Sequence, residues 1–372
     1  MEYKKNYFIQ FSPDSQRLLA NLEHSYATWV DAKRNFDALP TSMYWVDKDG
    51  VEYLAIKTTA NDNGTSAGRR SPATESQLQE YAESKKRLKE RISATDEQLR
   101  ERAGLYRRLR LPSIPDRQAE IIRRLDIEGM MGTDLMVVGT NAFIAYEAAC
   151  GARFPTGNEE TEDFDMAWCR NTNASIHASL SLNSINGSEQ PKKSLFAVLR
   201  SLDSSYAINK KKPYQAINND GYEVELLAAP STHPLPKNEA FEPMQTLIEQ
   251  EWLLKGQPIS TVVATVRGRA CPLYVPDPRW MALHKMWLSE KPERNPAKKG
   301  KDARQGDVLL DAVRHFLSGS HPLNINFLMS LPEELLSHFN KWCTSRGFIP
   351  SDDDSNGEER EAWLVNDLPY PR

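Results

Sequence analysis

The sequence has few cysteines, and none of them are closely spaced. The four of them, Cys150, Cys169, Cys271 and Cys343, are scattered along 372 residues. A structural zinc site needs closely paired Cys or His ligands, so this pattern excludes one, and it equally disfavours a disulfide framework. We expect reduced thiols that pack in the interior as small apolar side chains.

The chain also lacks a long hydrophobic run and an excess of charge of one sign. No segment reaches the roughly 18 apolar residues of a membrane span, and the segment from Met1 to Lys5 has no apolar signal region, which predicts a cytoplasmic protein. Forty-seven basic and 51 acidic residues give a net charge of −4. A strongly basic nucleic-acid binder is therefore disfavoured, whereas a local basic groove is not. The hydrophobic share of 40% is enough for a packed core.

The first 115 residues are predicted to form an extension that precedes the main domain. Leucines and aromatic residues at helical spacing predict a helix from Ser12 to Asp37. Two β-rich runs within residues 43–56 flank an Asp-Gly turn and predict a hairpin. Residues 58–73 are polar and glycine-rich, which is typical of an exposed loop. Residues 76–109 predict two charged helices with a break near Ser93-Ala-Thr-Asp, and the prolines at 112 and 115 mark the boundary.

Residues 116–275 alternate between helical and β-rich segments, which predicts an α/β (α+β) core with a mixed sheet. The predicted strands and helices are residues 118–127, 135–138, 142–150, 161–168, 192–202, 214–218, 222–227, 261–266 and 270–275. Residues 276–350 predict a C-terminal helical region, with helices at 280–289, 302–317 and 332–345. The acidic tail at 351–372 is predicted to be solvated or disordered.

Two short motifs in the core carry chemistry. Gly139-Thr140-Asn141 follows an apolar strand and precedes a helix, where a glycine lets the backbone approach a phosphate and the helix N-terminus supplies N–H donors. Taken alone, this motif is also an ordinary tight turn. Asp163 and Asp165 alternate along the next strand, so their carboxylates share one face, and Phe164 is expected to point into the core with Met166.

The two like charges of Asp163 and Asp165 repel one another unless a cation lies between them. A hard divalent ion, Mg²⁺ first and Mn²⁺ second, suits such oxygen ligands. Glu225, flanked by apolar residues on a later strand, is the candidate third carboxylate, while Glu223 is interpreted as a solvated charge at the strand edge. Three carboxylates on adjacent strands can hold two metal ions about 3.5–4 Å apart, the arrangement used for in-line displacement at phosphorus.

In this order, Gly139-Thr140, Arg153, Thr161-x-Asp163-x-Asp165 and Glu225 resemble the nucleotidyltransferase fold of the DNA polymerase β superfamily. The sequence is most similar to a bacterial group of predicted nucleotidyltransferases with an N-terminal hairpin-and-helix extension. That group's pattern is echoed by Glu52-Tyr-Leu54, by Gly68-Arg-Arg-Ser71, and by Pro276-x-Pro278 leading to His284-Lys285. The resemblance covers most of residues 40–315.

The resemblance implies a role for each motif. It implies that Gly139 and Thr140, with Asn141 beside them, hold nucleotide phosphates, and that Asp163, Asp165 and Glu225 bind two metal ions. Two departures stand out. Residues 154–160 are an apparent insertion that forms either a lid or a simple loop, and the third acid is Glu where Asp is commoner.

Several basic residues have two interpretations each. Arg153 either pairs with a triphosphate or forms a salt bridge that orients the acidic strand, and Lys285 is a candidate triphosphate ligand on a C-terminal helix. His284 is interpreted as a packed histidine. The clusters Lys210-Lys-Lys212 and Lys298-Lys-Gly-Lys301 line an acceptor groove or are solvated loops.

These motifs predict a magnesium-dependent enzyme that transfers a nucleoside monophosphate from an NTP to an acceptor and releases pyrophosphate. An RNA end is the favoured acceptor, with a protein or a small molecule as alternatives, and no membrane partner is expected. The alternative function is a catalytically inactive nucleotide-binding or interaction module. A third possibility is metal-dependent phosphoester hydrolysis.

Overall fold

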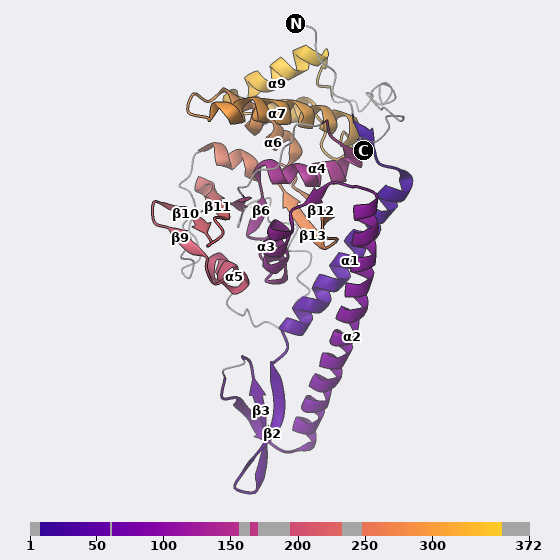
Figure 1. Ribbon diagram of the computed structural model, residues 1–372, viewed down its shortest axis with the longest axis vertical. Coiled ribbons are helices and arrows are strands. Elements are labelled where there is room, and N and C mark those ends of the chain that lie inside the picture. The colour runs from indigo at the N-terminus through magenta and orange to yellow at the C-terminus, as the bar shows by residue number, and fades with distance from the viewer. Residues whose placement is uncertain (1–7, 60–61, 156–163, 170–193, 233–247, 352–372) are drawn as a thin grey trace.

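The structure is a computed structural model that describes residues 8–59, 62–155, 164–169, 194–232 and 248–351. It has an α/β core, a layer of helices on one end of that core, and a long two-helix stalk that carries a small sheet at its far end (Figure 1). The sequence therefore predicted the mixed fold class correctly. Within the described residues, no helix is both long and apolar enough to cross a membrane.

The central sheet of the core has five strands and mixed directions. Its order is β6 (Leu135–Val137), β8 (Phe164–Trp168), β11 (Glu223–Ala228), β10 (Lys212–Ile217) and β9 (Ala207–Asn209). Strands β8 and β11 run parallel, and the other neighbours are antiparallel. Phe164 and Met166 are fully buried, as the sequence predicted, because alternate residues of β8 point into the core.

A second, three-stranded sheet lies beside the first, with order β13 (Ala270–Val275), β12 (Ile259–Thr265) and β5 (Ser113–Ile114). The predicted hairpin at residues 261–275 is therefore confirmed. The remaining elements of the core are α3 (Asp116–Ile127), the 3₁₀ turn η1 (Gly139–Ala142), α4 (Phe143–Cys150), α5 (Leu195–Leu202), the 3₁₀ turns η3 (Pro230–Thr232) and η4 (Ile248–Leu254), and the short pair β1 (Ile9–Gln10) and β7 (Ala152–Arg153). The four cysteines are buried, as expected.

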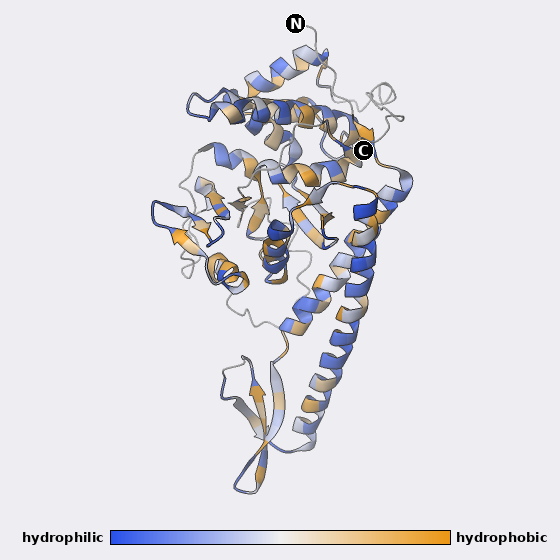
Figure 2. Cartoon of the chain, in the orientation of Figure 1, coloured by the Kyte–Doolittle hydropathy of each residue, from blue (hydrophilic) through white to orange (hydrophobic). Residues whose placement is uncertain are grey.

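The stalk consists of α1 (Pro13–Asp37) and α2 (Pro72–Arg108), which lie side by side (Figure 1). At a rise of about 1.5 Å per residue, the 37-residue α2 is about 55 Å long. Hydrophilic residues dominate its length in Figure 2, because most of its surface meets solvent. A buried ion pair joins the stalk to the core: Arg34 of α1 lies 3.0 Å from Asp126 of α3.

Between the two stalk helices, the chain forms a three-stranded antiparallel sheet, which we call the arm sheet. Its strands are β2 (Ser42–Lys48), β3 (Val51–Lys57) and β4 (Thr65–Arg69). The predicted hairpin is confirmed as β2 and β3. The prediction of a loop over residues 58–73 is wrong in part, because β4 adds a third strand there and α2 begins at Pro72.

The predicted break of the long helix near residues 93–96 is also wrong, since α2 is continuous. The hydroxyl of Thr95 donates to the carbonyl of Arg91 one turn earlier, 2.7 Å away, so it does not cap a new helix. Thr95 and Leu99 are buried, which fixes this part of α2 by packing. Tertiary contacts therefore override a local helix-start signal.

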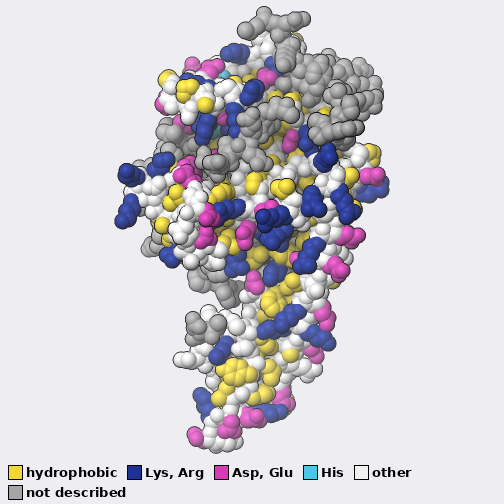
Figure 3. All heavy atoms as spheres, viewed as in Figure 1, with side chains coloured by type: hydrophobic (Ala, Val, Ile, Leu, Met, Phe, Trp, Pro, Cys, Tyr) yellow, Lys and Arg dark blue, Asp and Glu magenta, His cyan; other side chains and the backbone are white. Residues whose placement is uncertain are grey.

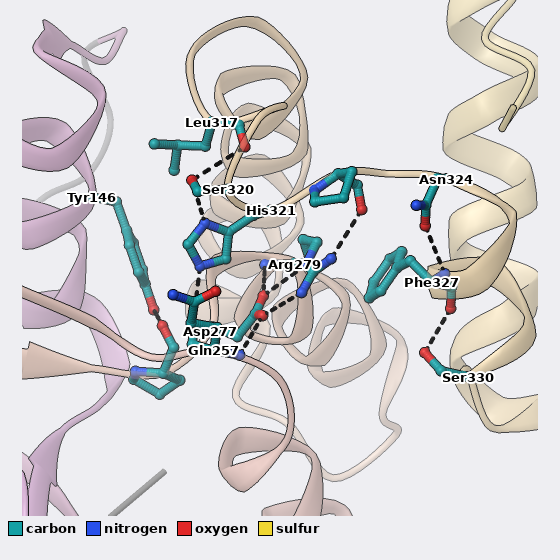
Figure 4. Close-up of polar contacts among 12 residues, drawn as sticks. Tyr146, Gln257, Asp277, Arg279, Leu317, Ser320, His321, Asn324, Phe327 and Ser330 are labelled. Carbon is teal, nitrogen blue, oxygen red and sulfur yellow. Dashed lines mark hydrogen bonds and ion pairs between the residues drawn. The ribbon is translucent and has the colours of Figure 1, made fainter. Parts of the chain in front are cut away.

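The C-terminal layer is helical, as predicted, with α6 (Pro278–Glu290), α7 (Pro296–Phe316), α8 (Ile325–Met329) and α9 (Glu333–Arg346). The direction of α6 is fixed at Asp277, which has no exposed surface and accepts hydrogen bonds from the backbone N–H groups of Gln257 and Arg279 (Figure 4). The hydroxyl of Tyr146 donates to the carbonyl of Pro276, 3.0 Å away. These hydrogen bonds fix the start of α6, the helix that contains Lys285.

Candidate functional site

The turn after β6 is built around Gly139. Its φ of +71° lies in the left-handed region, which favours glycine. A Cβ atom added at Gly139 would lie 2.5 Å from Oδ2 of Asp165, so only glycine lets the backbone pass this close to the carboxylate. The backbone N–H of Val138 also donates to the carbonyl oxygen of Asp165, 3.1 Å away. The predicted glycine corner and the acidic strand therefore lie in direct contact.

Asp165 and Glu225 lie directly opposite one another on the parallel strands β8 and β11. Neighbouring strands are about 4.7–4.9 Å apart, so side chains at paired positions on one face stand next to each other. The buried residues on either side, Phe164 and Met166 on β8 and Val224 and Leu226 on β11, point to the opposite face. Two of the three predicted carboxylates are thus brought together on two inner strands of the sheet.

The third predicted carboxylate, Asp163, lies outside the described residues, as does the segment 156–163 that includes most of the proposed insertion. Among the residues that the structure describes, no group of three or more His, Cys, Asp or Glu residues is placed to hold a metal ion. The described part of the site therefore consists of one carboxylate pair beside a glycine corner.

Gln215 is a member of this cluster that the sequence analysis did not identify. It pairs with Glu225 across β10 and β11 and is almost fully buried. Its side-chain amide donates to Oε2 of Glu223 at 2.6 Å and to Oε1 of Glu225 at 3.1 Å. Gln215 thereby fixes the orientation of Glu225. The interpretation of Glu223 as a merely solvated charge is wrong, because Glu223 shares this hydrogen-bond donor.

Lys285 is buried on α6, where it forms an ion pair with Asp302 of α7. Its ammonium group lies 2.8 Å from Oδ1 of Asp302, and the guanidinium of Arg294 lies 2.6 Å from the other oxygen of the same carboxylate. Burial lowers the pKa of Lys285, whereas the charges of Asp302 and of Asp165 raise it. The effect of Asp165 shows that the predicted lysine lies within electrostatic range of the acidic strand. Asp302 holds it there and was not identified from the sequence.

His284 packs within the C-terminal layer, as the sequence analysis interpreted it. Its ring is stacked on Trp287 and lies edge-on to Trp252. Burial lowers the pKa of His284 to about 3, and the adjacent charge of Lys285 contributes. The imidazole is therefore neutral at physiological pH and is not an acid or base that titrates near neutrality.

The other predicted residues fall in different places. Thr140 and Asn141 are buried within η1, next to Gly139. Arg153 lies on β7, where it donates to the carbonyl of Arg110, and its charge partly offsets the rise in the pKa of Glu147 that burial causes. The contacts of Arg153 with the described chain thus join β7 to the end of the stalk and do not include Asp165.

The two lysine clusters lie on two different elements of the structure. Lys210 and Lys211 form the turn between β9 and β10, and Lys212 begins β10, in the same sheet as Asp165. Lys298, Lys299 and Lys301 lie in the first turns of α7, next to Asp302. In Figure 1, the β9–β10 hairpin and the connection from α6 to α7 both lie on the side of the core away from α1 and α2.

Comparison with protein families gives one match. The model of a family described as nucleotidyltransferase matches residues 116–324, which is more than half of the chain. The chain therefore belongs to this nucleotidyltransferase family, and the matched region contains the glycine corner, the carboxylate pair and Lys285. Comparisons with curated proteins and with solved structures found no match.

A carboxyl group of α4, the helix that follows the glycine corner, leads to a prediction of how the stability of the fold depends on pH. Glu147 of α4 accepts a hydrogen bond from the backbone N–H of Phe154 at 2.7 Å, and burial raises its pKa from 4.5 to about 7. The folded state then binds more protons than the unfolded state between these values. We expect the free energy of unfolding to fall as the pH rises from about 5 to about 8.

This shift corresponds to at most about 3 kcal/mol, an upper limit because part of the Glu147 side chain reaches solvent. A Glu147→Gln variant retains an oxygen that can accept from Phe154 and removes the titration. Urea unfolding of both proteins at pH 5 and pH 8 measures the difference. An unchanged pH dependence in the variant would contradict the assignment to Glu147.

Proposed function

We propose that this protein is a magnesium-dependent enzyme that transfers a nucleoside monophosphate from an NTP to an acceptor and releases pyrophosphate. The observation that carries the proposal is the register of Asp165 against Glu225, with the backbone of Gly139 in contact with Asp165. An isolated Asp-x-Asp pattern or an isolated Gly-Thr turn is common. Their contact within a chain of this family is what a phosphoryl-transfer site requires.

The residues at this site fit divalent metal ions. Asp165 and Glu225 offer carboxylate oxygens, the ligands that Mg²⁺ prefers, and we propose that Asp163 completes the set for two ions, with Mn²⁺ as an alternative. The missing Cβ of Gly139 leaves room at Oδ2 of Asp165. When bound, the metal ions lower the pKa of the acceptor hydroxyl and neutralise the triphosphate and the leaving pyrophosphate.

The chain's own residues then bind and orient the nucleotide. The backbone N–H groups of η1, which begins at Gly139 and includes Thr140 and Asn141, can donate to phosphate oxygens. Lys285, held in place by Asp302, supplies a positive charge within electrostatic range of Asp165. Gln215 keeps Glu225 in a single orientation through its amide. Arg153 is not assigned a role in nucleotide binding, because its contacts are with Arg110 and Glu147.

We propose an RNA end as the acceptor. The exposed lysines of the β9–β10 turn belong to the same sheet as the carboxylate pair, and the lysines at the start of α7 lie next to Asp302, the partner of Lys285. Lys and Arg side chains gather at the tip of that hairpin in Figure 3. Such a distribution suits a phosphate-rich acceptor even though the whole chain carries a net charge of −4.

The test is a transfer assay with each of the four α-³²P-labelled NTPs, Mg²⁺, and total RNA or total protein as acceptor. We expect labelled RNA with the wild-type protein and no label with an Asp165→Ala/Glu225→Ala double variant. Equal labelling by both proteins would contradict the enzyme and favour a binding module. Release of free nucleotide without a labelled acceptor would indicate hydrolysis, and labelled protein would contradict the RNA acceptor alone.

The glycine corner gives a second, matched test. In Gly139→Ala, the new methyl group displaces the Asp165 carboxylate, and a displacement of about 1 Å can cost about 10²-fold in rate. Gly221→Ala is the control: its φ of +79° imposes the same backbone strain, but nothing lies within 4 Å of the added Cβ. We expect both variants to lose similar thermal stability and only the first to lose transfer activity. Equal activities would show that the contact with Asp165 is unimportant.

A further inference from the structure

We propose that the outward face of the arm sheet binds RNA and holds the acceptor at a distance from the site of transfer. The identity of this RNA as the acceptor rests on the function proposed above. The arm sheet consists of β2, β3 and β4, and its outward face is defined by Tyr44, Val46, Lys48, Val51, Tyr53, Lys57 and Arg69. The argument starts from the two faces of this sheet.

One face of the arm sheet is covered by α2. Leu54 on that face is fully buried, and a Cβ added at its pairing partner Gly68 would lie 3.8 Å from Thr74 in the first turn of α2. Arg70 bridges Glu52 on this side and Glu75 of α2, with both distances 2.7 Å. Gly68 of this face therefore lies against the first turn of α2, and Glu52 is tied to α2 through Arg70.

The strand pairing places the seven residues named above on the opposite face. Tyr44 pairs with Ala55, Val46 with Tyr53, Lys48 with Val51, and Tyr53 in turn with Arg69, so their side chains alternate away from Leu54. Tyr44 and Val51 are each 37% exposed, and Lys48 and Arg69 are also exposed. The stalk thus leaves an aromatic and basic surface uncovered by the described chain.

The cations of this face are arranged around its tyrosine rings. The ammonium of Lys57 lies 5.8 Å from the centre of the Tyr44 ring, and the guanidinium of Arg69 lies 5.9 Å from that of Tyr53. Arg69 also donates to the Tyr53 hydroxyl at 3.2 Å. Among the described residues, neither Lys48 nor Arg69 forms an ion pair. The charges of this face are therefore available to an anionic partner.

Two carboxylates lie near this face: Asp49, in the turn between Lys48 and Val51, and Asp62, whose oxygens are already bound. The oxygens of Asp62 accept from the backbone N–H groups of Thr58 and Gly64 and from the Thr58 hydroxyl. These hydrogen bonds, together with the charge of Lys57, lower the pKa of Asp62. Asp62 shapes the loop before β4, and the three cations of the outward face, Lys48, Lys57 and Arg69, outnumber the two nearby carboxylates.

The position of the arm sheet fits an extended acceptor. In Figure 1, the arm sheet lies below the core, on the same side of α2 as the β9–β10 hairpin. Figure 3 shows hydrophobic side chains over the arm with Lys and Arg beside them, and Asp and Glu side chains at its lower end. Because α2 is about 55 Å long, a molecule that contacts both the arm sheet and the site must extend over tens of ångströms.

RNA matches this surface better than a protein partner does. Tyrosine rings stack on unpaired bases, and lysine and arginine beside the rings bind the phosphates that connect those bases. A stable protein interface would need a larger apolar centre than Tyr44, Val46, Val51 and Tyr53 provide. The net charge of the whole chain does not oppose this, since binding depends on the local concentration of positive charge.

Binding is measured by fluorescence anisotropy with the full chain and a labelled oligouridine, longer than the roughly 4–16 nucleotides that a single-strand-binding fold covers. We expect Tyr44→Ala/Tyr53→Ala to raise the Kd about tenfold or more, and Tyr44→Phe/Tyr53→Phe, which keeps both rings, to leave it within about twofold. Lys48→Glu/Arg69→Glu changes only exposed charges, so it tests the face without disturbing packing. We expect this variant to bind the oligouridine more weakly and its Kd to depend less on salt concentration. Wild-type affinity in both the alanine and the glutamate variants would overturn the proposal.

Kinetics separate this inference from the proposed function. With total RNA as acceptor, the arm variants are expected to raise the KM for RNA and leave kcat unchanged, whereas Asp165→Asn abolishes transfer and leaves oligouridine binding intact. Binding through the arm without any transfer would support the arm and contradict the enzyme. Transfer with unaltered KM in every arm variant would support the enzyme and overturn the arm. A dimer in sedimentation that Lys48→Glu/Arg69→Glu dissociates would also overturn it, by making this face a contact between copies.

Discussion

Replacing Asp165 by asparagine is expected to lower the rate of nucleotidyl transfer by about 10³-fold or more. Asn has nearly the same shape as Asp but no charge, so it removes one anionic oxygen from the pair formed with Glu225. The loss of several kcal/mol of charge stabilisation at the transferred phosphoryl group corresponds to a factor of this size. The measurement is the initial rate of labelled-NTP transfer at saturating Mg²⁺.

Glu223→Gln is the matched control for Asp165→Asn. Glu223 lies on the same strand as Glu225 and shares the amide of Gln215, yet it pairs with Ile217 of β10 and with none of the described residues of β8. We expect it to lose less than about tenfold in rate, since only the orientation of Gln215 is affected. Similar losses in both variants would show that the catalytic carboxylates are not those paired between β8 and β11.

Replacing Asp302 by alanine is expected to lower the free energy of unfolding by about 3–5 kcal/mol, the usual cost of removing one partner of a buried ion pair. Asp302 and Lys285 are both almost fully buried, and the carboxylate also binds Arg294. Its removal leaves the ammonium of Lys285 in a site where burial already lowers the lysine pKa. Urea unfolding at pH 7 measures the change.

Two further variants distinguish the effect of an unpaired buried charge from the effect of lost packing. Asp302→Leu/Lys285→Met removes both charges and is expected to recover most of the stability, because the uncompensated ammonium is gone. Asp96→Ala breaks an exposed pair with Arg100 within α2 and is expected to cost less than about 1 kcal/mol. If Asp302→Ala is no more destabilising than Asp96→Ala, Lys285 is not held by this pair. If Asp302→Ala retains full transfer activity, Asp302 does not position Lys285 for the nucleotide.

Much of the fold follows from local patterns. The helix that begins at Ser12, the hairpin around Asp47 to Gly50 and the alternation in β8 were each predicted, because each depends on neighbouring residues alone. Ser12 caps α1 by accepting from the N–H of Ser15, as its position before a proline indicated. Strand β4 was missed because a short, polar edge strand becomes regular only when β3 pairs with it.

Sequence reasoning identified only part of the candidate site, because some of its residues have a recognisable local signal and others have none. A glycine at a strand-to-helix turn and an acidic residue on an otherwise apolar strand have few structural explanations. Sequence neighbours were therefore enough to identify Gly139, Asp165 and Glu225 one by one. Gln215, Asp302 and Arg294 carry no such signal: a glutamine in a strand and charged residues beside a lysine-rich segment are usual on a protein surface. Their roles follow only from the side chains that they contact.

The sequence by itself determined which residue types can do chemistry and on which face of a strand they stand, because a period of two or 3.6 residues is a property of the local backbone. Only the tertiary structure decided that Glu225 lies opposite Asp165 in a parallel register and that Lys285 is buried against Asp302. It also decided that the arm sheet has one face on α2 and the other toward solvent. These arrangements depend on the summed packing of segments far apart in the chain, a non-local quantity that no local pattern encodes.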